Sequence, residues 1–319
     1  MTDSRARLHT IDGAPTLRFE RRLAHPPEKV WRAISDPAEM AAWFPAAVTT
    51  ELRPGAAMRF TFADAPETTD SVSAGEVLEV DPPKVYMFRW SQDVLRFELV
   101  ADGDGTLLIF THVLGGGPRA RLGAARSAVG WDRCLSALAA DLDGAHTEPD
   151  RSWLTDIESY VADFGLDTGM CDEVPDGYVL RFARDLVWQP PETLWSLLVE
   201  DEIPAVGAPP PARATNQHVE AGALLGVDPP RSMEYRWRHE GTVVGTVRWS
   251  FEADPDFGVW VELTQTVPAR LARLRPTLLA AWHVHLELFF AATQGDIRCP
   301  WPAERVAVLA ERYAADLGE

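Results

Sequence analysis

The sequence is short of positive charge and has no long apolar run. It contains 30 Lys and Arg residues against 48 Asp and Glu residues, so its formal net charge is -18. Binding to nucleic acid or to anionic lipid needs a basic surface, and neither partner is expected here. No apolar run reaches the roughly 20 residues that a membrane helix needs. The polar, charged N-terminus is unlike a signal peptide. We therefore expect a cytoplasmic protein that binds neither nucleic acid nor membranes.

Cysteine is scarce as well, and no familiar catalytic motif is present. Cys134, Cys171 and Cys299 are far apart and form neither a CxxC pair nor a disulfide framework, which is typical of a reducing compartment. The sequence lacks a nucleophile elbow, a phosphate-binding glycine loop and a dinucleotide fingerprint. His283 and His285 are two residues apart on a predicted helix, so they cannot bind one metal from one face. We predict no metal site and no other cofactor.

What the sequence does contain is an internal repeat, which is the first feature to look for in a chain of this length. Residues 17–23 resemble residues 180–186, and residues 75–90 resemble residues 222–237. Both segments of the second pair contain Val-Asp-Pro-Pro, and both end in an aromatic residue that is followed by Arg and then Trp. Just after the first match, equivalent residues of the two copies are 164 positions apart in the sequence, whereas in the second match they are 147 positions apart. The second copy is therefore 17 residues shorter in the region between the two matches.

The shortened region corresponds to a predicted hairpin of the first copy. Within residues 48–62, alternation places Met58, Phe60 and Phe62 on one face after a Pro-Gly turn. The second copy has the proline-rich stretch 204–211 instead. Because proline cannot donate a hydrogen bond to a neighbouring strand, at least one strand should be missing there. We expect the sheet of the second copy to be truncated.

Each copy is predicted to fold as an α+β unit. A strand is followed by two short helices, a run of antiparallel strands and one long helix near residues 124–142. This helix must cover the concave face of a curved sheet, an arrangement that leaves a cavity suited to a ligand. The predicted divisions are domain 1 at 1–145, a helical connector at 146–175, a degenerate domain 2 at 176–295 and a C-terminal helix at 296–319.

Several motifs of the first copy resemble the START-like (SRPBCC, helix-grip) superfamily. They further resemble the family named after the activator of heat-shock-protein-90 ATPase. The motifs are the Ala-His-Pro-Pro-Glu-Lys-Val-Trp segment 24–31, Asp36-Pro37, Trp43-Phe44, the segment 75–90 and Gly130-Trp131. The resemblance covers residues 15–145 well and 178–295 weakly. It implies two tandem helix-grip domains, the second with a truncated sheet. It does not imply one function, because the superfamily includes lipid carriers, hormone receptors and aromatase/cyclases.

Strand alternation assigns a largely aromatic set of side chains to the interior of domain 1. We predict that they bind the ligand: Trp43, Phe44, Phe60, Tyr86, Phe88, Trp90, Phe97, Phe110, His112 and Trp131. His112 is the polar member and the candidate general base, with Glu76 as its catalytic partner if both share one face. Two alternatives stay open. His112 could be a buried histidine hydrogen-bonded by a neighbour, and a bulge could turn Glu76 away. The second copy has Ala223 and Gln265 at these positions.

Three functions are compatible with this interpretation. In the first, domain 1 binds a small hydrophobic or aromatic molecule and domain 2 is structural. In the second, the protein is a cyclase/aromatase- or lyase-type enzyme in which His112 moves a proton. In the third, it is a chaperone-associated protein-binding module. The other domain, a second copy of the chain or another protein partner would cover the sheet edge that the missing hairpin leaves open.

Overall fold

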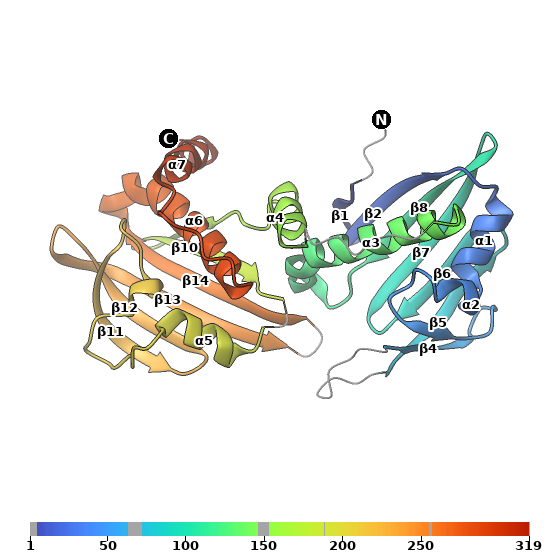
Figure 1. The fold of residues 1–319 in the computed structure, drawn as a ribbon. Helices are drawn as coiled ribbons and strands as arrows, with labels where there is room; N and C mark the ends of the chain where they lie inside the picture. The colour runs from blue at the N-terminus through green and yellow to red at the C-terminus, as the bar shows by residue number, and fades with distance from the viewer. Residues whose placement is uncertain (1–4, 63–71, 146–152, 188, 255–256, 319) are drawn as a thin grey trace. The chain divides into compact units, whose positions relative to one another are not determined.

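The computed structural model describes residues 5–62, 72–145, 153–187, 189–254 and 257–318 (Figure 1). The chain divides into two compact units, Met1–Tyr160 and Val161–Glu319. The division falls within helix α4 (Trp153–Asp163). Among the described residues, no helix is long and apolar enough to cross a membrane.

The first unit is built on an eight-stranded antiparallel sheet with the order β1-β2-β8-β7-β6-β5-β4-β3. Its strands are β1 (Arg7–Ile11), β2 (Ala14–Leu23), β3 (Ala47–Thr49), β4 (Ala57–Thr61), β5 (Val72–Asp81), β6 (Val85–Trp90), β7 (Asp93–Asp102) and β8 (Gly105–Val113). The apolar residues of the long strands alternate, so that one face of each is buried and the other faces solvent. This alternation gives the sheet the single apolar face that the helices cover.

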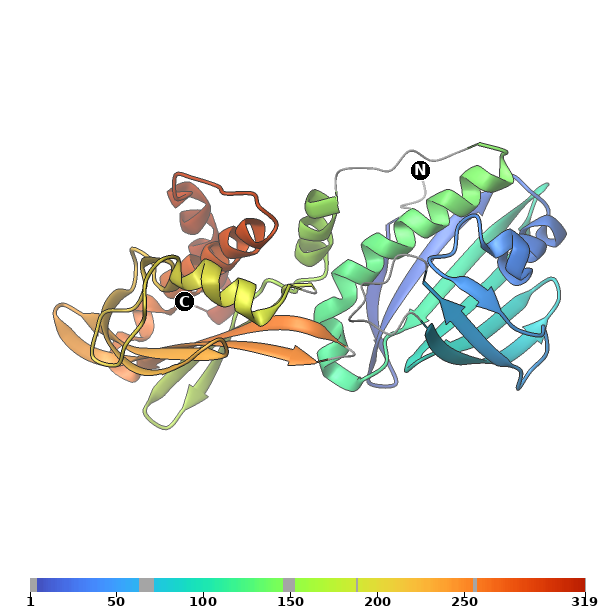
Figure 2. The same cartoon turned by 60° about the horizontal axis from the view of Figure 1, so that its bottom comes forward.

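The helices of the first unit begin at proline and capping residues that the sequence contains at these positions. Helix α1 (Pro27–Ser35) has a proline in its first turn, and Asp36 caps α2 (Pro37–Met40) by accepting a hydrogen bond from the Ala38 amide. A 3-10 turn, η1 (Gly117–Gly123), leads into the long helix α3 (Ala124–Leu142). Helix α3 lies along the sheet of this unit (Figure 2). The predicted order of strand, two short helices, strands and long helix is confirmed.

The second unit repeats this plan on a six-stranded antiparallel sheet with the order β11-β12-β13-β14-β10-β9. Its strands are β9 (Met170–Val174), β10 (Gly177–Asp185), β11 (Glu220–Asp228), β12 (Ser232–His239), β13 (Thr242–Asp254) and β14 (Gly258–Pro268). Its helices are α5 (Pro191–Val199), η2 (Ala212–Ala214), η3 (Ala269–Leu274), α6 (Arg275–Thr293) and α7 (Ala303–Leu317). Helices α5 and α6 lie on the same face of the sheet (Figure 2).

The truncated sheet of the second unit is confirmed, and it loses two strands. In the described residues nothing corresponds to β3 and β4, while the turn that precedes β4 is retained. In the first unit, Val77 on β5 exchanges two backbone hydrogen bonds of 2.8 and 2.9 Å with residues 55–56. In the second, Leu224 on β11 makes the equivalent bonds of 2.9 and 2.7 Å with residues 207–208. The proline-rich stretch therefore covers part of the sheet edge that the missing hairpin exposes.

The segment predicted as a helical connector, 146–175, contains α4 and also strand β9. Strand β9 pairs with β10 and so forms the edge of the second sheet. It corresponds to β1, which pairs with β2 at the edge of the first sheet.

Candidate functional site

The aromatic residues predicted to bind a ligand in the first unit form one packed cluster. Their inward orientation is confirmed, since Tyr86, Phe88, Phe97 and Phe110 are completely buried. The ring of Phe44 lies 5.5–6.2 Å, between centroids, from those of Phe60, Phe88, Trp90 and Trp131. Trp43 lies 5.9 Å from Phe97, and Phe110 lies 4.5 Å from both Phe97 and Trp131. These rings pack against one another as core side chains do. Their role in ligand binding stays a prediction.

His112 is held between two partners. The Trp131 indole donates to His112 Nδ1 at 2.9 Å, so Nδ1 is the acceptor nitrogen and Nε2 donates to Asp93 Oδ2 at 2.8 Å. The second unit repeats the first of these two bonds, since Trp282 donates to Gln265 Oε1 at 2.7 Å. Both copies therefore use this strand position to accept a hydrogen bond from the helix tryptophan. His112 has no free nitrogen with which to move a proton, which favours its interpretation as a buried, hydrogen-bonded histidine.

Glu76 does not face His112, and this expectation is corrected. A bulge between Val77 and Glu79 shifts the register of β5 against β6, and Val77 instead of Leu78 enters the core. Glu76 is exposed and lies opposite Arg89 on the outer face. The pattern Glu-Val-Leu-Glu-Val allowed either register, so alternation alone could not locate the bulge.

A buried hydroxyl of the first unit has no hydrogen-bond partner among the described residues. The Tyr86 hydroxyl belongs to a completely buried side chain and makes no hydrogen bond within this part of the protein. Burial raises the pKa of this phenol, so it stays protonated at all ordinary pH values.

The second unit contains a pocket of about 270 Å³ that the sequence did not predict. It lies between α6, the segment around η2 and the residues that connect α6 to α7. The lining residues are Arg213, Thr215, Asn216, His285, Leu288, Phe289, Ala292, Ile297, Arg298 and Trp301. Ile297, Arg298 and Trp301 follow α6 and lie outside the best-matched parts of the repeat, so comparison of the two copies gave no reason to place them at a site.

Three polar atoms that belong to residues of this lining are buried without a hydrogen-bond partner among the described residues. They are His285 Nδ1, Asn216 Nδ2 and Trp301 Nε1. His285 Nε2 lies 2.9 Å from the carbonyl oxygen of Arg213, and because a carbonyl only accepts, Nε2 carries the proton and Nδ1 is a bare acceptor. Burial lowers the pKa of His285 to about 4, which keeps this ring neutral. The Asn216 oxygen accepts from the His218 amide at 3.0 Å, which leaves Nδ2 as the free end.

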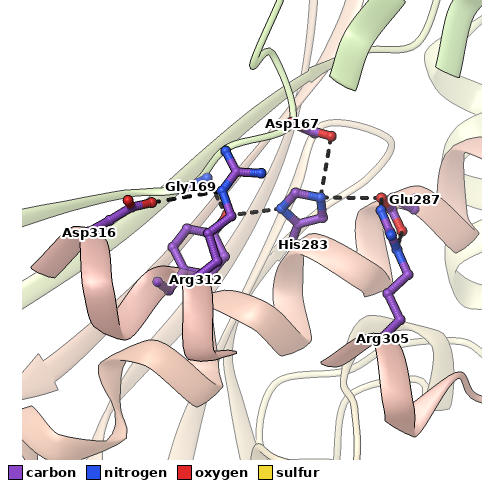
Figure 3. A network of polar contacts seen from close by, with 8 residues as sticks. Asp167, Gly169, His283, Glu287, Arg305, Arg312 and Asp316 are labelled. Carbon is purple, nitrogen blue, oxygen red and sulfur yellow. Dashed lines mark hydrogen bonds and ion pairs between the residues drawn. The ribbon is translucent and has the colours of Figure 1, made fainter. Parts of the chain in front are cut away.

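A separate polar network joins α6 to α7 and to the segment before β9 (Figure 3). His283 Nε2 lies 3.3 Å from Asp167 Oδ2 and 3.2 Å from Glu287 Oε1, and its Nδ1 lies 3.0 Å from the Tyr313 hydroxyl. Arg305 on α7 binds both oxygens of Glu287. Burial alone would lower the pKa of His283, but Asp167 and Glu287 raise it overall. Burial would raise the pKa of Glu287, but Arg305 and His283 lower it to about 2.

Asp167, His283 and Glu287 have the donor types of a metal site, with their ligand atoms all within 4.8 Å of one another. The guanidinium of Arg305 already binds both carboxylate oxygens of Glu287. A protonated His283 balances the remaining negative charge of Asp167. The electrostatics therefore fit an imidazolium between two carboxylates without any metal.

Comparison with known proteins agrees with the resemblance seen in the sequence. Residues 24–143 match the family described as activator of Hsp90 ATPase homolog 1-like protein, so the predicted family resemblance is confirmed for this segment. No curated protein sequence matches the chain.

Solved structures similar to this one include CalU16 from Micromonospora echinospora, which is 22% identical with a TM-score of 0.40. The match covers 51% of this chain and 97% of CalU16. DynU16, from the dynemicin biosynthetic locus, is 20% identical with a TM-score of 0.39, and the match covers 94% of this chain and 98% of DynU16. A protein from Bordetella parapertussis is 25% identical with a TM-score of 0.38, over 52% of this chain and 93% of that one.

Proposed function

We propose that this chain, whose residues 24–143 match the activator of Hsp90 ATPase homolog 1-like family, binds a small, mainly apolar molecule in the pocket of its second unit. The observation that carries the proposal is the wall of that pocket. It combines the apolar side chains of Leu288, Phe289 and Ile297 with a few polar residues, Thr215, Asn216 and His285. Ligand sites typically have this composition of an apolar lining with a few polar groups that fix orientation.

The proposed ligand site lies in the second unit, whereas the sequence predicted it in the first. In the first unit the predicted lining residues contact one another, whereas in the second a pocket of about 270 Å³ lies beside α6. An engineered apolar cavity of about 150 Å³ holds benzene. The pocket is therefore large enough for a molecule with one or two rings.

Binding is a better interpretation than catalysis. His112, the candidate base of the first unit, has both nitrogens in hydrogen bonds. In the pocket, His285 is a neutral acceptor, and the lining residues include no serine, cysteine or carboxylate. The hydroxyl of Thr215 in this lining already donates to the Val219 carbonyl at 3.0 Å. Such a set of residues can hold and orient a molecule without reacting with it.

Native mass spectrometry of protein purified from its own host tests the proposal. We expect a co-purifying small molecule that is released by gentle denaturation. Ala292→Phe fills the pocket and should abolish this molecule. Thr293→Phe places the same side chain one residue further along α6, outside the lining, and should retain it. A molecule that persists in Ala292→Phe, or the absence of any bound molecule from wild-type protein, would contradict the proposal.

A further inference from the structure

We infer that the molecule bound in the pocket of the second unit is a carboxylic acid with an apolar body, and that Arg213 binds its carboxylate. The inference rests on the proposed function and adds the chemical class of the ligand. It follows from the charges of the pocket lining and from the way in which Arg213 is held.

The pocket lining is basic although the protein is acidic. The lining residues include Arg213 and Arg298 but no Asp or Glu. In the whole chain, 48 Asp and Glu residues outnumber 30 Lys and Arg residues. Charges more than about 8–10 Å away are largely screened at physiological ionic strength, so the residues of the lining weigh most on a bound molecule. The lining therefore favours an anion over a cation.

Arg213 uses only part of its guanidinium to bind the protein. Its Nε donates to Glu200 Oε1 at 2.7 Å, and its two terminal nitrogens make no hydrogen bond with the described residues. These nitrogens are not buried, and the side chain is 32% exposed. Because the Glu200 side chain is 48% exposed, solvent weakens this ion pair and it does not occupy the guanidinium fully. The terminal nitrogens form the planar end that matches the two oxygens of a carboxylate.

The backbone that carries Arg213 is fixed by three other elements. The Arg213 carbonyl accepts from His285 Nε2 on α6 at 2.9 Å. The next carbonyl, of Ala214, accepts from the Tyr235 hydroxyl on β12 at 2.8 Å and from Trp249 Nε1 on β13 at 2.9 Å. All three donor side chains are buried. A guanidinium on such a fixed backbone loses less freedom when it binds a ligand, which favours affinity.

The bond to His285 also connects Arg213 with the apolar part of the lining. Phe289 follows His285 by one turn of α6, and Leu288 and Ala292 of the same helix line the pocket as well. The pocket therefore offers an apolar surface and a guanidinium to one molecule. An apolar acid uses both, whereas a hydrocarbon leaves the guanidinium without a partner.

Three probes with one naphthalene ring system test the inference in the full-length protein by isothermal titration calorimetry at about pH 7, where a carboxylic acid is ionised. 1-Naphthoate carries the carboxylate, and 1-naphthamide has nearly the same shape without the charge. 1-Naphthol reports whether the pocket binds the rings. We expect 1-naphthoate to bind at least about tenfold more tightly than 1-naphthamide. This preference should decrease as salt is added.

A pair of matched variants assigns the preference to Arg213. Arg213→Gln removes the guanidinium and should reduce the preference for 1-naphthoate to less than about threefold. Its affinity for 1-naphthol should stay within about twofold of wild type, which shows that the pocket is intact. Arg231→Gln makes the same change in an exposed side chain that pairs with Asp228 outside the lining, and it should keep the full preference.

The outcomes separate the two proposals. Equal affinity for 1-naphthoate and 1-naphthamide, with 1-naphthol bound, would overturn the inference and leave the proposed function standing. A preference for 1-naphthoate that survives Arg213→Gln would also overturn the inference, because another group would then bind the carboxylate. So would a wild-type preference that does not change with salt. Failure of all three probes to bind would overturn the proposed function together with the inference.

Discussion

The stability of the second unit should depend on pH through the network around His283. Glu287 is the member whose contribution can be worked out best. Its pKa is lowered from 4.5 to about 2 by Arg305 and His283, against the opposing effect of burial. A shift of this size corresponds to about 3 kcal/mol of stabilisation of the charged carboxylate. The Glu287 side chain is only 18% exposed, so solvent screening reduces this value little.

The two titrating partners define the window in which the network is strongest. The lowered pKa of Glu287 gives stability that is present above about pH 4.5 and is lost as the pH falls toward 2. The raised pKa of His283 gives stability that is fully present below about pH 6.5 and is lost as the pH rises through the folded-state value. The contribution of the network should therefore be largest between about pH 4.5 and 6.5 and should decrease on both sides.

The variant Glu287→Gln removes the charge and keeps the size of the side chain. At about pH 5.5 it should lower the free energy of opening of α6 and α7 by roughly 2–3 kcal/mol, an increase of about 30- to 150-fold in exchange. Amide hydrogen exchange read by mass spectrometry, corrected for intrinsic rates, measures this in the helices concerned. Glu311→Gln makes the same change on the exposed face of α7 and should cost less than about 0.5 kcal/mol.

Two results would refute the reasoning. One is equal protection of α6 in the Glu287→Gln and Glu311→Gln variants at about pH 5.5. The other is wild-type protection of α6 that does not decrease between about pH 6 and 9, since His283 must lose its proton above its folded-state pKa.

Three further predictions concern single side chains. Tyr86→Phe removes a buried hydroxyl without a partner and should stabilise the first unit by about 1 kcal/mol, seen as a higher thermal transition; destabilisation would mean that the hydroxyl is satisfied. Trp131→Phe leaves His112 Nδ1 without a hydrogen bond and should lower the free energy of unfolding, measured in urea, by about 2 kcal/mol. An unchanged free energy of unfolding would show that this bond does not stabilise the first unit. The affinity of the pocket for 1-naphthol should be constant between about pH 5.5 and 8, because His285 stays neutral; calorimetry at both ends would detect a change.

The fold could be predicted largely from the sequence because its signals are local and occur twice. Alternation identified the buried faces of the long strands, and the two copies supported each other where they matched. The 17-residue difference between the copies was sufficient to locate the missing hairpin. The retained turn at 207–208 was not predicted. Both copies have Gly-Ala there, but a dipeptide is too short to align without the backbone hydrogen bonds that the structure shows.

The candidate site could be predicted only in part. The burial of His112 followed from alternation, but its partner Asp93 lies 19 residues earlier on a neighbouring strand, and only the register of β7 against β8 brings the two together. Glu76 was misplaced because a bulge reverses the alternation of β5. The pocket of the second unit combines segments around Arg213, on α6 and at Trp301. No local pattern connects those three segments.

A crystal structure of the protein with 1-naphthol would test most directly whether the second unit holds the ligand. We predict the naphthol rings in the pocket beside α6, against Phe289. Naphthol bound among the aromatic residues of the first unit, with the pocket beside α6 unoccupied, would contradict the account.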